Sequence, residues 1–551
     1  MKTRSWTASC RRDDVEPSFR CLPFKRSGSL RARALALLLA CGFAAAAVAQ
    51  EDTVWVRRFD GTAHGAEYIA ASAHDRWGNI YVTGYATNTG SDKDYVTIKY
   101  RPNGDTVWVR AYNGPDNERD IARAIAVDND GNVWVTGESR GPGTGYDYAT
   151  IRYDSLGTSL WVSRYSAPGD SEDWSQAIAL GPAEVCYVTG GSFAPGTGSD
   201  FLTIKYGPDG DTLWSRRYDY SDDWASKVIV DSAGDIYVAG TDYDSSELIV
   251  MKYGPTGDLY WAKRHTGWAN DMALGSLGRV YIVGGYYSPT GGEDFLTIAY
   301  DAASGDTVWT ATLDGPAHAR DGATSLAVGA SGRIYVTGHS IRDTVDKNKD
   351  FLVVCYQPTG DTAWVRRVPG VYPGGQDYPE AIALDGAERI YVGGYGADSA
   401  GNNGPVAVSY DSGGVQHRLA RYTGPGGSGG SWCTVSTFGS TAVYLAGYSE
   451  GLGTMSDCTV AKYGPFLGIA DQGEPASPGF APGGATIVRG VLMTGDRGQK
   501  TGGRVELLDV SGRTVARLAP GANEVGRFAP GIYFVRHAIS TGTSTRKVVF
   551  E

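Results

Sequence analysis

Cysteine, histidine and long apolar runs are scarce in this sequence. It has seven cysteines and seven histidines in 551 residues, and only Cys186, Cys355, Cys433 and Cys458 follow the first fifty positions. So few cysteines exclude a disulfide framework. No C-x-x-C pair occurs and the histidines show no H-E-x-x-H spacing, which argues against the common zinc sites. We expect buried free thiols, with a bridge between Cys433 and Cys458 left open as the alternative.

Charged residues are also few, at 20% of the chain, and the formal net charge is −11. A net negative protein is repelled by phosphate backbones and anionic membranes, so we expect no nucleic-acid partner. The composition is instead rich in glycine, with 77 residues, and in aromatic residues, at 11%. This combination indicates many short strands joined by tight turns, and it excludes a helical or disordered chain.

The one long apolar run, Ala34 to Ala49, follows a basic leader. Small residues at its end predict a secretory signal peptide over 1–49 with cleavage between Ala49 and Gln50. The run is shorter than the roughly 20 residues that a transmembrane helix needs. A lipoprotein signal at Cys41 is the alternative. The leader therefore predicts Sec export.

One sequence unit recurs eight times after the leader. A glycine ends the second predicted strand of each unit, at Gly84, Gly137, Gly190, Gly240, Gly284, Gly338, Gly393 and Gly447. A tyrosine closes the third, at Tyr100, Tyr153, Tyr206, Tyr253, Tyr300, Tyr356, Tyr410 and Tyr463. In the second unit, strands are predicted over Ala124–Asp128, Asn132–Gly137, Tyr148–Tyr153 and Ser159–Tyr165. Turn signals such as Asp-Asn-Asp-Gly and Pro-Asn-Gly separate the strands and predict hairpins.

The ends of the repeat region predict how it closes. The chain after the leader begins with an unpaired fourth strand, 53–59, and the repeats end with an unpaired third strand, 457–463. Pairing these two segments removes exposed sheet edges. The sequence therefore predicts an all-β, eight-bladed β-propeller over 50–467, with four-stranded antiparallel blades closed by the N-terminal strand.

A tryptophan occupies the same place in nearly every fourth strand, and Arg418 alone breaks the series. The tryptophans are Trp55, Trp108, Trp161, Trp214, Trp261, Trp309 and Trp364. Repetition favours a structural role over a binding surface, so each indole is expected to wedge between adjacent blades.

Two patterns resemble known propeller families. The pattern D-x-x-G-N-[IV]-[YW]-V-T-G followed by D-[YF]-x-T-I-[KR]-Y, over about 53–465, resembles the bacterial exported β-propeller repeat family, which implies fold and compartment. The run Ala299–Trp309 is similar to the tryptophan-docking motif of quinoprotein dehydrogenases. Those enzymes bind pyrroloquinoline quinone with calcium, commonly beside a vicinal disulfide. This chain has no adjacent cysteine pair, so no cofactor is expected.

A separate unit over 485–551 follows a proline- and glycine-rich linker, 468–484. Strand-like runs at 503–509, 514–518, 532–537 and 545–550 predict a small Ig-like β-sandwich. The motifs VELLDVSGRTVARL, APGIYFVRH and TRKVVFE resemble the type A C-terminal sorting domain of type IX secretion. The resemblance implies that a type IX-like machinery is a partner and that the chain reaches an extracellular or outer-membrane surface location after Sec export. An ordinary Ig-like module is the alternative.

An acidic residue precedes the first strand in most units and provides the candidate binding site. The seven are Glu67, Asp120, Asp173, Asp223, Asp271, Asp321 and Asp377. They could form a ring at the channel mouth that holds a cation or a cationic ligand. Alternatively, each accepts N–H bonds within its own loop. The acids before the third strands, Asp94, Asp147, Asp200, Glu247, Asp294, Asp350 and Asp457, are expected to be structural.

No residues form a recognisable catalytic pattern: the sequence has no G-x-S-x-G elbow and no phosphate-binding loop. The prediction is a monomeric, non-enzymatic binding or scaffold protein whose ligand is a glycan or a protein. The irregular insertions 370–376 and 424–431 are glycine-rich, which favours a binder. The alternative is a secreted propeller enzyme, a hydrolase, a lyase or quinoprotein-like, with its site at the channel mouth.

Overall fold

A computed structural model describes residues 53–464, apart from 169–171, 195, 197, 220–221, 289–291, 343–347, 369–374, 399, 423, 428 and 441, together with strands between 486 and 550. The chain divides into two compact units, 1–466 and 467–551. The predicted signal peptide, its cleavage site at Ala49 and Gln50, and the linker 468–484 lie outside the described residues.

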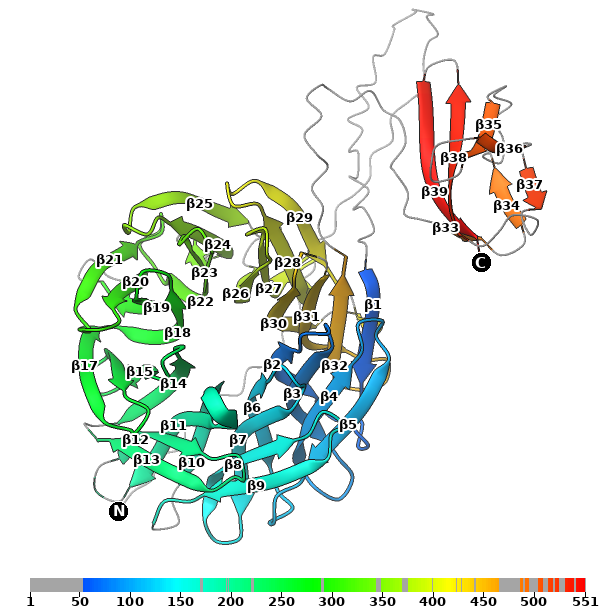
Figure 1. Ribbon diagram of the computed structural model, residues 1–551. Coiled ribbons are helices and arrows are strands. Elements are labelled where there is room, and N and C mark those ends of the chain that lie inside the picture. The colour runs from blue at the N-terminus through cyan, green and yellow to red at the C-terminus, as the bar shows by residue number, and fades with distance from the viewer. Residues whose placement is uncertain are drawn as a thin grey trace, which may run out of the picture. The chain divides into compact units, whose positions relative to one another are not determined.

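The first unit is an eight-bladed propeller of four-stranded antiparallel sheets, as predicted (Figure 1). Blade 1 contains β2 (Tyr68–His74), β3 (Ile80–Thr87), β4 (Lys93–Tyr100) and β5 (Thr106–Tyr112). Blade 2 contains β6 (Asp120–Val127), β7 (Val133–Gly141), β8 (Gly145–Tyr153) and β9 (Ser159–Tyr165). Blade 3 contains β10 (Asp173–Leu180), β11 (Cys186–Ala194), β12 (Gly198–Tyr206) and β13 (Thr212–Tyr218), with a short 3₁₀ turn at Pro182–Glu184. Blade 4 contains β14 (Asp223–Val230), β15 (Ile236–Asp242), β16 (Glu247–Tyr253) and β17 (Leu259–Thr266).

The second half of the ring repeats this order. Blade 5 contains β18 (Trp268–Gly275), β19 (Arg279–Tyr287), β20 (Glu293–Asp301) and β21 (Thr307–Leu313). Blade 6 contains β22 (Gly322–Val328), β23 (Ile334–Ile341), β24 (Lys349–Tyr356) and β25 (Thr362–Val368). Blade 7 contains β26 (Tyr378–Leu384), β27 (Ile390–Ala397), β28 (Asn403–Tyr410) and β29 (Gln416–Arg421). Blade 8 contains β30 (Gly430–Phe438), β31 (Ala442–Glu450), β32 (Ser456–Tyr463) and, from the other end of the chain, β1 (Thr53–Phe59).

The predicted closure is confirmed in register. Strand β1 pairs antiparallel with β32, with Thr53 opposite Tyr463 and Phe59 opposite Cys458. Hydrogen bonding between the two ends of the repeat region leaves no blade with an unpaired third strand, which stabilises the ring against opening.

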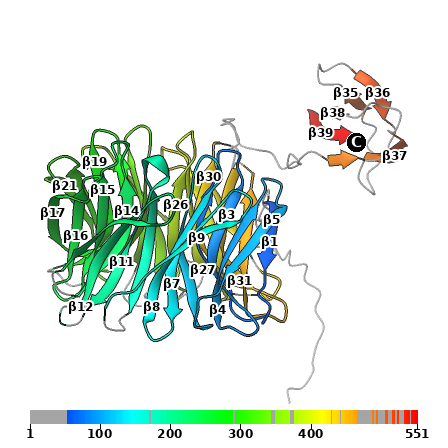
Figure 2. The ribbon, with the colours of Figure 1, turned by 60° about the horizontal axis from the view of Figure 1, so that its bottom comes forward.

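The first strand of each blade lies nearest the channel and the fourth lies at the rim (Figure 1). The first strands begin earlier than predicted. Strand β6 starts at Asp120 and not at Ala124, because a β-bulge between Ala122 and Ala124 interrupts the alternation of buried and exposed residues. The same bulge occurs in all eight first strands. Strands run between two sets of loops at opposite ends of the propeller (Figure 2). We call the end that carries the loops between blades, such as 60–67, the loop face.

Second and third strands are buried on both sides because each sheet packs against two neighbours. Between blades 8 and 1, Ile69 and Val82 share a core with Tyr444 and Val460. Similar cores fill the other seams. The four cysteines within the described residues are free, and Cys186, Cys355 and Cys458 are buried, so the alternative bridge between Cys433 and Cys458 is not formed.

The recurring tryptophan of the fourth strands joins adjacent blades, as predicted. The Trp55 indole N–H, in blade 8, donates to the Pro102 carbonyl of the β4–β5 turn of blade 1 at 3.0 Å. Gly104 of that turn has φ +88°, and a Cβ there would lie 2.8 Å from the Trp55 ring. Glycine is therefore required both by its backbone conformation and by the close approach of the indole. Five further blades repeat the indole-to-carbonyl bond.

The second unit contains two sheets. Its strands are β33 (Thr486–Val488), β34 (Val491–Thr494), β35 (Arg504–Leu508), β36 (Thr514–Leu518), β37 (Gly521–Glu524), β38 (Gly531–Ile539) and β39 (Gly542–Phe550). Five pair in the order β33-β39-β38-β35-β36, and β34 pairs with β37. The four predicted strands are present, and the Ig-like sandwich stays a prediction. Nowhere in the described chain does a helix reach the length and apolarity that crossing a bilayer requires.

Candidate functional site

Six of the seven predicted acidic residues occupy one equivalent slot at the start of the first strand, on the loop face. All six are buried, and Asp377 is the most accessible, at 4%. Asp120 accepts from the Gly114 N–H at 2.5 Å and Asp173 from the Ala167 N–H at 2.7 Å. These bonds fit the alternative interpretation, in which each carboxylate holds its own loop. Cation binding by the ring as a whole stays a prediction.

Asp271 differs from the other six. In blade 5 the equivalent slot is occupied by Gly267. The register shows this, since Trp268, which follows Gly267, pairs with Gly285 in the way that Ile121, which follows Asp120, pairs with Glu138. Asp271 lies four residues further on, within β18, where it forms an ion pair with Lys227 at 2.8 Å. The shorter fifth repeat hid this shift of register from the sequence.

A polar network that the sequence analysis missed recurs within several blades at the loop face. An arginine of the fourth strand binds an aspartate of the third and a serine of the second. Arg217 lies 2.6 Å from Asp200 and donates to the Ser192 hydroxyl at 2.6 Å, and Ser192 donates to Asp173 at 2.5 Å. Arg164, Arg367 and Arg58 make the same contacts in blades 2, 6 and 8. The sequence feature that could have revealed this network is the serine two residues after the repeat glycine.

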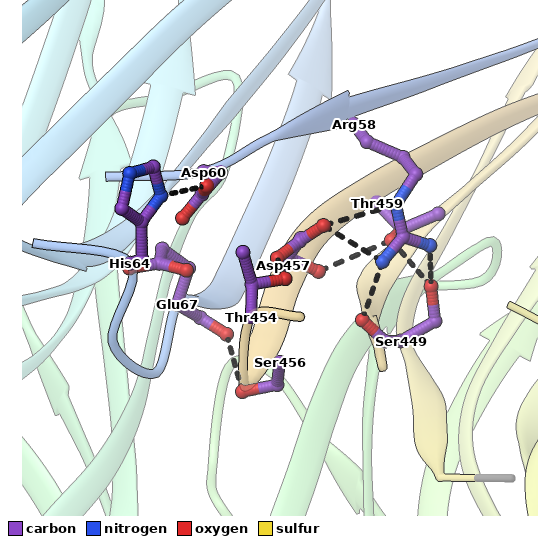
Figure 3. Close-up of polar contacts among 9 residues, drawn as sticks. All are labelled: Arg58, Asp60, His64, Glu67, Ser449, Thr454, Ser456, Asp457 and Thr459. Atoms are coloured by element: carbon purple, nitrogen blue, oxygen red, sulfur yellow. Dashed lines mark hydrogen bonds and ion pairs between the residues drawn. The ribbon is translucent and has the colours of Figure 1, made fainter. Parts of the chain in front are cut away.

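At the seam between blades 8 and 1, two further acids lie beside this network. Carboxylate oxygens of Asp60, Glu67 and Asp457 lie within 4.8 Å of one another, one from the loop after β1, one from just before β2 and one from β32. Figure 3 shows them gathered where β1 runs beside β32. His64 Nδ1 lies 2.5 Å from Asp60 Oδ2, and the Glu67 N–H donates to the Ser456 carbonyl at 2.7 Å.

Glu67 is the most constrained acid of this seam. It is fully buried, its Oε1 accepts from the Thr87 N–H at 3.3 Å, and its Oε2 has no hydrogen-bond partner among the described residues. Burial raises the pKa of Glu67 to about 7, and the charges of Asp60 and Asp457 add to the shift. The hydrogen bond that protonated His64 donates to Asp60 raises the pKa of His64.

The seam between blades 5 and 6 repeats the three acids and the histidine, with Asp321 in place of Glu67 and Thr312 in place of Arg58. Asp294, Asp314 and Asp321 bring carboxylate oxygens within 4.8 Å, from β20, from the loop after β21 and from just before β22. His318 Nδ1 lies 2.5 Å from Asp314, as His64 does from Asp60. Burial is the main cause that raises the pKa of Asp294 and of Asp321. In the described residues these two clusters are the groups with metal-ligand spacing.

A hollow of about 730 Å³ opens on the loop face over blades 7 and 8. Tyr395, Asn403, Tyr448 and Glu450 supply its aromatic and polar lining. Glycines of the predicted insertion at 424–431 form one wall, and Thr454, Met455 and Ser456 of the β31–β32 loop form another. The Thr454 hydroxyl donates to Asp457 at 2.8 Å, so the hollow adjoins the seam of blades 8 and 1.

Aromatic rings continue beside this hollow. Tyr448 lies 5.4 Å from Tyr68 between ring centroids, Tyr68 stacks on Tyr85 at 5.9 Å, and Tyr395 stacks on Tyr378 at 5.9 Å. The tyrosines of the second strands are therefore braced by neighbouring rings. A pocket wall of braced aromatic faces with a few polar groups is typical of a small-molecule site.

Comparisons with known proteins assign no family. No protein-family model matches the chain, and no curated protein matches it. Similar solved structures include the quinohemoprotein alcohol dehydrogenase from Comamonas testosteroni, with 12% identity over 79% of each chain and a TM-score of 0.48. The WD40 domain of SCAP from fission yeast has 10% identity over 75% of this chain and 99% of that chain, with a TM-score of 0.42. At such values the likeness carries no statement about activity.

Proposed function

We propose that this chain is an exported binding protein that takes an extracellular saccharide into the hollow over blades 7 and 8. The observation that carries the proposal is the pairing of Tyr395 and Tyr448 with Asn403 and Glu450 around one opening. Sugar rings present C–H groups to aromatic faces and hydroxyls to amide and carboxylate groups, so this lining suits them.

The glycine-rich wall supports the same ligand class. Gly426, Gly429 and Gly430 line the hollow with backbone instead of side chains. Backbone N–H and C=O groups can then approach a polyhydroxylated ligand closely, as close-approach glycines permit elsewhere. A large side chain at these positions would fill the opening.

Export is part of the proposal and rests on the leader and the C-terminal unit. The predicted signal peptide directs Sec export, and the resemblance of 485–551 to type IX sorting domains favours release or attachment at the cell surface. The free thiols suit a chain whose fold needs no disulfide, because its ring is closed by strand pairing. We propose that it acts as a monomer.

A glycan array probed with chain 50–551, followed by calorimetric titration of the best saccharide, tests this function. Tyr448→Ala and Tyr395→Ala should each weaken binding at least about tenfold, since stacking and burial are lost. Trp77→Ala is the control, because Trp77 is an exposed aromatic residue in the β2–β3 turn, away from the loop face. Equal loss in the control, or no saccharide bound, would contradict the proposal; saccharide cleavage products would favour the enzyme alternative.

A further inference from the structure

We propose that the saccharide bound in the hollow over blades 7 and 8 is an amino sugar with a free, protonated amine. The amine lies against the rings of Tyr395 and Tyr448, and the carboxylates of Glu450 and Glu380 are its counter-charges. This inference rests on the proposed function of the hollow and narrows its ligand to a cationic class of saccharide.

The lining of the hollow carries negative charge. Glu450 is the only charged side chain among the described lining residues, and it is exposed. Its carboxylate lies against the glycine-rich wall, since a Cβ on Gly429 would be 2.5 Å from Glu450 Oε1. No ion pair within the described part of the chain neutralises this carboxylate. A cationic group of the ligand is therefore favoured over a neutral or anionic one at this place.

Glu380 is a second carboxylate without a cation. It is the extra residue of the β-bulge in β26, between Pro379 and Ala381, and β26 is the strand of blade 7 nearest the channel (Figure 1). Glu380 is half-buried, and burial raises its pKa. Within the described residues its carboxylate forms no hydrogen bond and no ion pair. Because a buried charge is costly unless it is paired, a cation beside Glu380 is stabilising.

Other acids near the channel have their cations within the protein. At the bulge of β6 the residue equivalent to Glu380 is Arg123, which lies 3.1 Å from Glu138. Asp271 of β18 lies 2.8 Å from Lys227 of β14. Glu380 therefore differs from these acids in depending on a cation from outside the described chain.

Tyrosine rings lie between the two carboxylates and the ligand. Tyr395 and Tyr448 line the hollow. Burial raises the pKa of both hydroxyls, and the charge of Glu380 adds to both shifts, so Glu380 lies near the same two rings. Aromatic faces attract a cation within about 6 Å of the ring centroid. The adjoining Tyr378 ring already holds one, since Lys349 Nζ lies 5.1 Å from its centroid.

The donor groups suit an amine better than a metal ion. Calcium prefers about six to eight oxygen ligands. No group with metal-ligand spacing in the described residues includes Glu450 or Glu380. A protonated amine needs three hydrogen-bond acceptors, and Glu450, Asn403 and the tyrosine hydroxyls supply acceptors around the hollow.

Calorimetric titration of chain 50–551 with two ligands tests the inference: a glucosamine tetrasaccharide and its fully N-acetylated counterpart, in a buffer that keeps the amines protonated. The two ligands share size and linkage and differ in charge. We expect the amine form to bind at least about tenfold more tightly, because charge-assisted hydrogen bonds and cation–π contacts are available to it alone. Added NaCl should weaken binding of the amine form and change that of the acetylated form little.

Glu450→Gln and Glu380→Gln should each lower the preference for the amine form at least about threefold, because one counter-charge is lost. Glu118→Gln is the matched control and should keep the full preference. Glu118 is also an exposed glutamate of the loop face, in the loop between blades 1 and 2. Because Glu450 is exposed, Glu450→Gln keeps the test decisive if Glu380→Gln does not fold.

Equal affinity for the two tetrasaccharides, or a preference that neither variant lowers, would overturn the inference and leave the saccharide site standing. Binding of neutral saccharides on the glycan array, with neither tetrasaccharide bound, would overturn it in the same way. A chain that binds no saccharide at all would contradict the proposed function together with the inference.

Discussion

Arg58 and Asp457 form an ion pair at 2.8 Å although 399 positions separate them. Arg58 belongs to the first strand of the propeller and Asp457 to the last, and both side chains are largely buried. Arg164 and Asp147 make the equivalent pair within blade 2, where the four strands are continuous in sequence. The same contact therefore closes the ring in one blade and only braces the sheet in another.

This difference gives the first prediction. Arg58→Ala and Arg164→Ala should each cost about 3 kcal/mol, since a largely buried carboxylate loses its partner. Only Arg58→Ala should also loosen β1, raising amide hydrogen exchange over 53–59 at least tenfold by mass spectrometry. Unchanged protection of β1 in Arg58→Ala would show that backbone pairing alone keeps the ring shut.

The tryptophan slot gives a second prediction. Trp108→Ala should cost about 3–5 kcal/mol, because a buried indole and its bond to the Ser155 carbonyl are lost between blades 1 and 2. Arg418→Trp should change stability by no more than about 0.5 kcal/mol, because blade 8 has no turn between its third and fourth strands for an indole to contact. Urea unfolding measures both, and a clear gain from Arg418→Trp would contradict this explanation.

Asp173 makes the folded chain less stable as the pH rises. Burial raises the pKa of Asp173 to about 6, although bonds from Ser192 and Ala167 oppose the shift. The stability that the protonated Asp173 carboxyl contributes is fully present below the unfolded pKa near 3.8. It is lost as the pH rises through 6, because ionisation is easier in the unfolded chain than in the folded one. Between pH 4.5 and 7.5 the stability of the wild type relative to Asp173→Asn should fall by about 2 kcal/mol. A pH-independent difference in urea unfolding would refute this.

His339 has the opposite dependence. Burial, with the charges of Lys349 and Arg320, lowers the pKa of His339 to about 3. The stability that the neutral His339 side chain contributes is present above pH 6.5. It is lost as the pH falls toward 3, because in that interval the imidazole is protonated only in the unfolded chain. His339→Phe keeps an aromatic ring on Tyr378, whose centroid lies 4.5 Å from that of His339, and should remove about 3 kcal/mol of the loss between pH 7.5 and 4.5. Unfolding curves of both proteins at the two pH values check this, and an equal acid loss would count against it.

The sequence alone determined the architecture. Recurring glycines and tyrosines set the number of blades, although Gly394 and not Gly393 takes the glycine position of blade 7. The unpaired segments at the two ends required each other as partners, because a sheet edge without a partner is unstable. Local rules sufficed here, since alternation, turn residues and repetition are properties of neighbouring positions in the chain. The sequence showed that Arg418 takes the place of tryptophan in one fourth strand, but it did not show why.

Only the tertiary structure decided which side chains meet. It placed Gly267 instead of Asp271 in the acidic slot of blade 5, brought Asp60 and Asp314 into acidic clusters at two seams, and brought Tyr395 and Tyr448 around one hollow. These groupings join loops from different blades, and their distances depend on the register of each strand and on how neighbouring sheets pack. Neither quantity is a property of a single repeat, so no reading of one repeat could supply them.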